Sequence, residues 1–190
     1  METLYELWGK RDPEWEKKYE DAIIGVFSDY GKGTTQWGEA RGKIFGAGYE
    51  VFIIAFFIGL YNKQTKPLTE DKAKRKKFGW PICNWGNQEA RNGRVPYPRL
   101  REYMFAALIA RTDIDFIALD KGETTPRKVV DLLIEKMEGY ANWGLDFMKE
   151  KMEDNPDFFF KESSFLRVFL DMMNAKTSSA STDDDMPEDL

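Results

Sequence analysis

Residues 44–61 form an almost unbroken apolar stretch, IFGAGYEVFIIAFFIGLY, that leaves the chain few ways to fold. A helix that is apolar on nearly every side lies either at the centre of a protein core or across a membrane. The stretch has about the minimum length for a span, and it contains three glycines. It also carries Glu50, whose charge would cost about 3 kcal/mol inside a bilayer. We therefore expect a core helix from residue 34 or 35 to Leu60, the most buried element, and no membrane contact.

Apolar residues recur at helical spacing in other segments, whereas residues 62–98 are broken by proline and glycine. A chain of 190 residues is typical of one domain. We predict an all-α or nearly all-α fold, a compact bundle of about five helices over residues 1–174, with a long basic loop rich in proline and glycine. The other expected helices lie at 12–27, 99–111, 125–152 and 163–173, with a short strand or extended crossing at 113–119. Gly139 and Gly144 are expected to bend the helix at 125–152 or to divide it before residues 145–152, and Ser163 or Ser164 is expected to cap the last helix.

The last residues, 175–190, are rich in serine and threonine and then acidic, so we expect a disordered tail. The run Asp183-Asp184-Asp185-Met186-Pro187 resembles the acidic C-terminal tip of bacterial single-stranded-DNA-binding proteins. That family ends on Phe after Pro, whereas this chain ends Glu188-Asp189-Leu190, so partner docking is not carried over. A tethered polyanion can compete with nucleic acid for a basic patch, or it can simply keep the chain soluble.

The chain contains no histidine and one cysteine, Cys83, and this excludes several classes of enzyme. Ser-His-Asp and Cys-His catalysis and an ordinary zinc site cannot be built without histidine or further cysteines. A lone cysteine also forms no intrachain disulfide, which fits a reducing compartment. No secretory signal is recognisable, so we expect a cytoplasmic protein. We expect no cofactor and no enzymatic activity.

The middle of the chain is strongly basic although the whole is acidic. Residues 41–101 contain 13 basic and four acidic residues, a net charge of +9, while the net charge of the chain is -5. We call residues 61–98, which hold most of these cations, the basic segment. Cations neutralise phosphates, and aromatic rings stack on the bases of single strands. The candidate nucleic-acid-binding residues are Lys72, Lys74, Arg75, Lys76, Lys77, Trp80, Trp85, Arg91 and Arg94.

Two functions fit this mixture of cations and aromatic rings. The first is a non-enzymatic, nucleic-acid-associated accessory protein, in which the cations contact phosphates while Trp80 and Trp85 stack on bases. The alternative is an adaptor subunit that docks an acidic partner protein through the same segment, with its aromatic side chains as anchors. The sequence leaves DNA versus RNA, the specific partner and the oligomeric state open.

Two weaker site hypotheses involve other residues. Asp113, Asp115 and Asp120, with Glu123 nearby, could form a carboxylate cluster for Mg²⁺, although acidic residues near turns are common. Residues 31–35, GKGTT, have some character of a phosphate loop but lack the residue order of a true P-loop. A plain turn and helix start also explains those residues.

The compact helical layout, the long apolar helix after Arg41 and a late helix near Gly144-Leu145 are similar to features of the small DndE proteins of DNA sulfur modification. Those proteins are helical and associate with DNA through lysine-rich surfaces. The resemblance therefore implies a DNA-related role, such as a part in a DNA modification or defence system. It assigns no functional residue to this chain.

Overall fold

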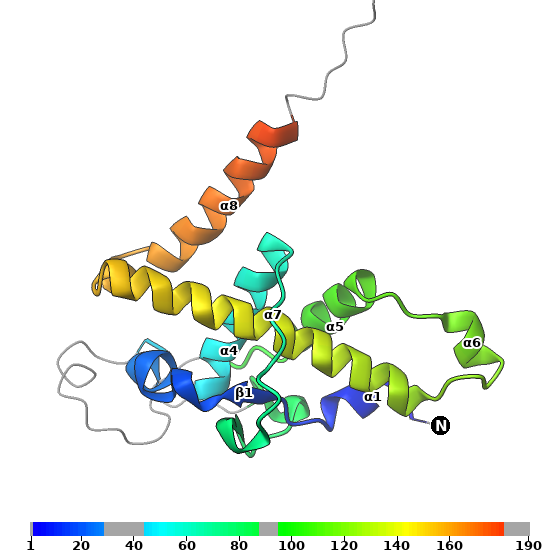
Figure 1. Ribbon diagram of the computed structural model, residues 1–190. Coiled ribbons are helices and arrows are strands. Elements are labelled where there is room, and N and C mark those ends of the chain that lie inside the picture. The colour runs from blue at the N-terminus through cyan, green and yellow to red at the C-terminus, as the bar shows by residue number, and fades with distance from the viewer. Residues whose placement is uncertain (1, 29–43, 88–94, 181–190) are drawn as a thin grey trace, which may run out of the picture. The chain divides into compact units, whose positions relative to one another are not determined.

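The computed structural model describes residues 2–28, 44–87 and 95–180, and these residues are mostly helical (Figure 1). The predicted all-α class is confirmed, with one two-stranded sheet as an addition. The chain divides into two compact units, Met1–Lys149 and Glu150–Leu190. The elements that begin in the first unit are α1 (Leu4–Gly9), β1 (Glu14–Glu16), η1 (Lys17–Tyr19), η2 (Glu20–Ile24), α2 (Gly25–Phe27), α4 (Gly48–Asn62), η4 (Lys72–Lys74), β2 (Arg75–Lys77), η5 (Ile82–Asn84), α5 (Leu100–Arg111), α6 (Phe116–Asp120) and α7 (Pro126–Asp154).

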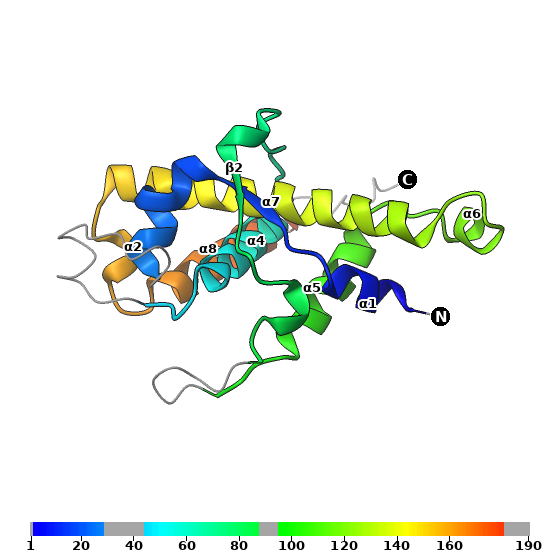
Figure 2. The ribbon, with the colours of Figure 1, turned by 90° about the horizontal axis from the view of Figure 1, so that it is seen from below.

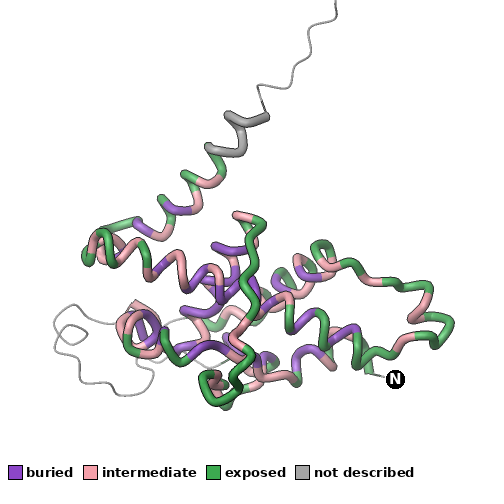
Figure 3. Tube along the Cα trace, viewed as in Figure 1, coloured by how far each residue is buried: buried purple, intermediate pink, exposed green. Residues whose placement is uncertain are grey.

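Helix α4 is buried on nearly every side, as the apolar stretch predicts (Figure 3). Its expected start near residue 34 is wrong for residues 44–47, which are described and are not helical. Glu50 therefore lies in the first turn, where its carboxylate accepts hydrogen bonds from the N–H groups of Gly46 and Ala47, at 2.6 and 3.3 Å. An acidic side chain is favourable there because the first N–H groups of a helix have no partner within it.

The helices that the structure describes include none with both the length and the apolar character needed to cross a bilayer. The apolar helix α4 itself has 15 residues. A span of the hydrocarbon layer takes about 20 residues at the rise of an α-helix.

Helices α4 and α7 touch backbone to backbone at two glycines. A Cβ on Gly59 would lie 2.2 Å from the carbonyl oxygen of Tyr140, and a Cβ on Gly144 would lie 1.9 Å from that of Ala55. Only glycine allows such an approach. Gly144 was expected to bend or divide its helix, but α7 is continuous, so the residue serves helix packing instead.

The N-terminal segment differs from the helix expected from residue 12. Residues 14–16 form strand β1, and a short 3-10 turn and a π-helix follow before α2. Strand β1 pairs antiparallel with β2, far along the chain, and Trp15 between the two acidic residues of β1 is 1% exposed. Helix α1 precedes this strand and begins with a capping box between Thr3 and Glu6.

The described part of the basic segment, residues 61–87 and 95–98, is loop-rich as predicted, but it is anchored at several points. Strand β2 lies beside β1 and crosses α7 in Figure 2. The apolar side chains of Ile82 and Trp85 are fully buried, and the ring of Phe78 packs against those of Trp15 and Trp85 at 5.6 and 6.0 Å between centroids. These contacts hold residues 75–85 on the core in a defined conformation.

Helix α5 matches the helix predicted at 99–111 to within one residue. The prediction for residues 113–119 is wrong, because residues 116–120 are helical. The short strand or extended crossing expected there is helix α6 instead. Asp115 caps it by accepting a hydrogen bond from the N–H of Ala118 at 2.8 Å. A capping aspartate satisfies an otherwise unpaired N–H, which explains why a short helix forms in an alternating sequence.

The second unit, taken by itself, contains the end of α7, the turn η6 (Phe158–Phe160) and helix α8 (Ser164–Ala180). The rings of Phe159 and Phe165 stack at 4.8 Å between centroids. The helix begins at the predicted serine pair, with Ser163 at a φ of 62°. It continues past residue 174, where the tail was expected to begin, and residues 181–190 of that tail lie outside the described residues.

Candidate functional site

Strand β2 places three predicted site residues opposite an acidic strand. The register pairs Lys77 with Glu14, and Arg75 with Glu16. The Arg75 guanidinium and the Lys77 ammonium lie 3.4 and 4.0 Å from the carboxylate of Glu14. The ammonium of Lys76 lies 2.5 Å from the carboxylate of Glu20. The N-terminal segment therefore partly neutralises the expected open cationic surface, through ion pairs between residues far apart in the sequence.

Lys72 and Lys74 lie on η4, directly before β2, and both are exposed. The Lys74 side chain is 72% exposed, and its ammonium lies 3.6 Å from the carboxylate of Asp71. Asp71 also caps η4 by accepting a hydrogen bond from the N–H of Ala73 at 3.0 Å. The contribution of such a solvent-exposed ion pair to stability is small, so Lys74 can exchange this partner for another anion.

The two tryptophans predicted to stack on bases have different environments. Trp80 is 39% exposed, whereas Trp85 is 0% exposed, so the Trp85 ring is not presented to a base on the surface of this structure. The Trp85 ring stacks on Tyr49 at 5.3 Å between centroids, and its indole N–H donates to the carbonyl of Trp80 at 2.9 Å. A large aromatic ring near proline and glycine here fills the core, because burying it removes much apolar surface from water.

The remaining predicted residues fall elsewhere. Arg91 and Arg94, the loop at 31–35 and Arg41 lie outside the described residues. Asp115 caps α6, and among the described residues no group of three or more cysteine, aspartate or glutamate side chains is arranged to hold a metal ion. The Mg²⁺ hypothesis therefore has no support from the described part of the chain.

A pocket of about 690 Å³ brings part of the basic segment together with the N-terminal segment and α7. Three of the predicted site residues, Lys72, Arg75 and Lys77, line it. The wall formed by α7 is acidic, because Asp131, Glu135 and Glu138 recur on one face of the helix. The remaining lining residues are Lys10, Arg11, Asp12, Glu14, Pro67, Leu68 and Ile134.

Two carboxylates of this pocket have perturbed ionisation. Burial raises the pKa of Glu138 to about 7, against the opposing hydrogen bond from the N–H of Glu14, which is 2.7 Å long. Burial also raises the pKa of Asp12, although that carboxylate accepts a hydrogen bond from the N–H of Gly79 at 2.9 Å. Perturbed carboxylates that line a pocket make it the best candidate site in the described chain.

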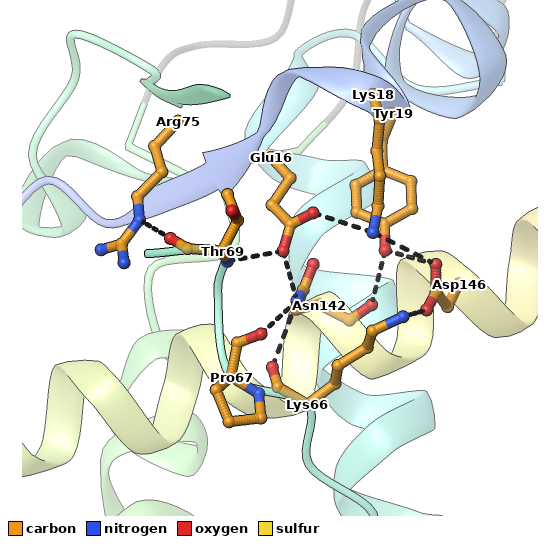
Figure 4. Close-up of polar contacts among 9 residues, drawn as sticks. All are labelled: Glu16, Lys18, Tyr19, Lys66, Pro67, Thr69, Arg75, Asn142 and Asp146. Carbon is orange, nitrogen blue, oxygen red and sulfur yellow. Dashed lines mark hydrogen bonds and ion pairs between the residues drawn. The ribbon is translucent and has the colours of Figure 1, made fainter. Parts of the chain in front are cut away.

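A buried polar network beside the pocket fixes its walls (Figure 4). The amide of Asn142, 1% exposed, donates to Glu16 at 3.0 Å and to the carbonyls of Lys66 and Pro67 at 3.2 and 3.0 Å. Glu16 also accepts a hydrogen bond from the N–H of Thr69 at 2.9 Å. One side chain of α7 thereby binds both β1 and the start of the basic segment.

The same network includes a cluster of charges around Asp146. Lys66 and Lys18 form ion pairs with its carboxylate, and Tyr19 donates its hydroxyl hydrogen to it. Burial acts to raise the pKa of Asp146, but the hydrogen bonds from Lys66 and Tyr19 outweigh burial and hold that pKa below its usual range. The pKa of Glu16 is lowered in the same way, where hydrogen bonds from Lys18 and from neighbouring donors outweigh burial.

Sequence reasoning missed Glu14, Glu138 and Asn142. The run Glu14-Trp15-Glu16 alternates charged and apolar residues, as a half-buried strand does. Its two acidic side chains were a signal for pairing with a basic strand. Asn142 lies among the buried residues of α7, and a buried polar side chain normally has a hydrogen-bond partner. Glu138 gave no comparable signal, since its environment depends on distant residues.

Comparison with protein-family models, with curated proteins and with solved structures finds no match to this chain.

Proposed function

We propose that this protein is a non-enzymatic interaction subunit, which docks an acidic segment of a partner protein on its basic segment. The observation that carries this proposal is a set of exposed cations on ordered backbone, followed closely in the sequence by an exposed tryptophan. Lys72, Lys74 and Lys77 are exposed, and Trp80 follows them at 39% exposure. Exposed cations attract an acidic chain, and a half-exposed tryptophan is a common anchor in protein interfaces.

The segment is also preorganised. Pairing with β1 and burial of Ile82 and Trp85 fix the backbone of residues 75–85 before any partner arrives. A partner then loses less binding free energy to the ordering of the segment, which favours affinity. This supports a docking surface over a loop that only solvates the domain.

A polypeptide fits the charge pattern better than a nucleic acid does. The carboxylates of Glu14, Glu20 and Asp71 lie against the cations and would repel a continuous row of phosphates. Burial of Trp85 also removes one of the two rings expected to stack on bases. An acidic peptide, in contrast, can place its side chains between these carboxylates.

A titration of the full chain tests this proposal. Labelled polyglutamate peptide and labelled oligothymidylate, matched in length at about twelve units, are followed by fluorescence anisotropy over a range of NaCl concentrations. We expect tighter binding of the peptide at every salt concentration. Tighter binding of the oligonucleotide contradicts the proposal, and absence of both complexes at low salt removes the basic segment as a binding surface for polyanions.

The second candidate is a nucleic-acid-associated accessory protein of a DNA modification or defence system. Its supporting observation is the closeness of exposed Lys77 to exposed Trp80 in the sequence, because a cation and a ring together suit the phosphate and base of a single strand. Under this candidate, Trp80→Ala weakens oligothymidylate binding several-fold and leaves polyglutamate binding almost unchanged. Equal weakening of both ligands contradicts a stacking role for Trp80.

A further inference from the structure

Ten charged side chains line the pocket of about 690 Å³, and their formal charges cancel when all are ionised. A single carboxylate that gains or loses a proton therefore decides whether the pocket is neutral or positive. The sign of the field in a cleft controls which ions it attracts. The five basic residues are Lys10, Arg11, Lys72, Arg75 and Lys77, and the five acidic residues are Asp12, Glu14, Asp131, Glu135 and Glu138.

Glu138 is placed to make this change. Its carboxylate points to β1, where it accepts the 2.7 Å hydrogen bond from the N–H of Glu14, and its side chain is only partly exposed. A carboxyl group in this position accepts the same hydrogen bond when it is protonated, so the fold survives its neutralisation. The charged groups that line the pocket with it are Lys10, Arg11 and Asp12 from the N-terminal segment, Glu14 from β1, Lys72, Arg75 and Lys77 from the basic segment, and Asp131 and Glu135 from α7. Of these, Glu14, Arg75 and Arg11 act directly on the charge of Glu138.

We propose that the pocket binds a carboxylate of the acidic partner together with one proton, which Glu138 takes up from solvent. This inference rests on the proposed function and adds regulation of the same binding site by pH. The bound carboxylate lies near Lys72, Arg75 and Lys77. The proton converts the Glu138 carboxylate to a carboxylic acid, so the negative charge of the ligand replaces the charge that Glu138 loses.

The direction of the pH dependence follows from these charges. Burial raises the pKa of Glu138 to about 7, while Arg75 and Arg11 act in the opposite direction. A ligand carboxylate adds a nearby negative charge and raises this pKa further. Affinity for an acidic ligand therefore increases as the pH falls from 8 to 6, by roughly fivefold at moderate salt, since one partly screened charge is removed.

Isothermal titration calorimetry of the full chain with the polyglutamate peptide measures the proton directly. Titrations at pH 7 in two buffers with different ionisation enthalpies give the number of protons taken up per peptide bound. We expect a clearly positive fraction below one, because Glu138 is already part-protonated near its pKa. An uptake of zero in the unmodified protein, with binding intact, overturns the inference.

Two variants assign the proton to Glu138. Glu138→Gln keeps the acceptor oxygen for the N–H of Glu14, so we expect it to bind at pH 8 as the unmodified protein binds at pH 6, without proton uptake. Glu135→Gln is the matched control, because it removes an exposed carboxylate from the same helix face and pocket. It raises affinity but leaves the proton uptake in place.

The results separate this inference from the function on which it rests. Loss of peptide binding at every pH contradicts the proposed function itself. Binding that does not change between pH 8 and pH 6 contradicts only the role of Glu138. Proton uptake that persists in Glu138→Gln shows that another group carries the proton and also overturns the assignment.

Discussion

The backbone N–H of Glu14 donates a hydrogen bond of 2.7 Å to the carboxylate of Glu138, across 124 positions of sequence. This contact joins β1 to α7 and forms part of the wall of the charged pocket. It also places a carboxyl group where burial raises its pKa to about 7. Fold and electrostatics are therefore linked at one residue pair.

The first prediction concerns stability and pH. The pKa of Glu138 is about 7 in the folded protein and near 4.5 in the unfolded chain. The stability that the protonated Glu138 side chain contributes is therefore fully present below pH 4.5 and is lost as the pH rises through about 7. Chemical denaturation of Glu138→Gln should show a smaller decline in the free energy of unfolding over this range, by at most about 3 kcal/mol. Equal profiles for the variant and the unmodified protein contradict the raised pKa.

The second prediction concerns the crossing of α4 and α7. Gly144→Ala places a Cβ 1.9 Å from the carbonyl oxygen of Ala55, so the helices must separate. We expect the free energy of unfolding to fall by about 3 kcal/mol. Gly139→Ala is the control, because its Cβ meets nothing closer than Thr65 at 3.4 Å. A stable Gly144→Ala protein would mean that the helices are not in this close contact.

The third prediction concerns the buried network. Asn142→Ala removes the hydrogen bonds that the Asn142 amide donates to the carboxylate of Glu16 and to the carbonyl of Pro67. Glu16 keeps its hydrogen bond from Thr69 and its ion pair with Lys18, so only the hydrogen bonds of the amide are lost. Their loss at buried acceptors should make the free energy of unfolding fall by about 1–3 kcal/mol. Asn87→Ala removes an exposed amide from the basic segment and should change it by less than about 0.5 kcal/mol. Similar denaturation midpoints for the two variants contradict a structural role for Asn142.

The fourth prediction separates the two tryptophans. Trp85→Ala opens a cavity in the core and should lower the free energy of unfolding by about 4 kcal/mol. Trp80→Ala should lower it by about 1 kcal/mol or less, since that ring is 39% exposed and the hydrogen bond between the two residues uses its backbone carbonyl. Thermal unfolding followed by circular dichroism measures both. The reverse ranking contradicts the burial of Trp85.

Elements with strong local signals could be predicted from sequence. The apolar run around α4 and the periodic pattern in α7 fix helices without knowledge of their neighbours, and Thr125-Pro126 marks the start of α7. Strand β1 could not be predicted in this way, because its three residues become a strand only when β2 pairs with them. The local sequence Asp12-Pro13 also suits the start of a helix. Residues 14–16 form a strand instead because they pair with β2 in the folded protein.

The candidate site was only half predictable, for the same physical reason. The basic cluster stands out in composition, but its ion pairs with Glu14 and Glu20 join residues far apart in sequence. Burial of Trp85 likewise depends on Tyr49 in α4, against which it stacks. The charged and aromatic composition therefore indicates where basic and aromatic residues cluster in the sequence. Which of these side chains are exposed depends on the fold.

The most direct test of the central claim is the affinity of the polyglutamate peptide for a protein without its exposed basic edge. In one variant Lys72, Lys74 and Lys77 are replaced by Gln, and in a control variant the exposed Lys121, Arg127 and Lys128 are replaced by Gln. Both lose three positive charges. The account predicts at least tenfold weaker binding for the first variant and a change of less than about twofold for the control. Equal loss in both variants would show that net charge, and not the basic segment, attracts the acidic ligand.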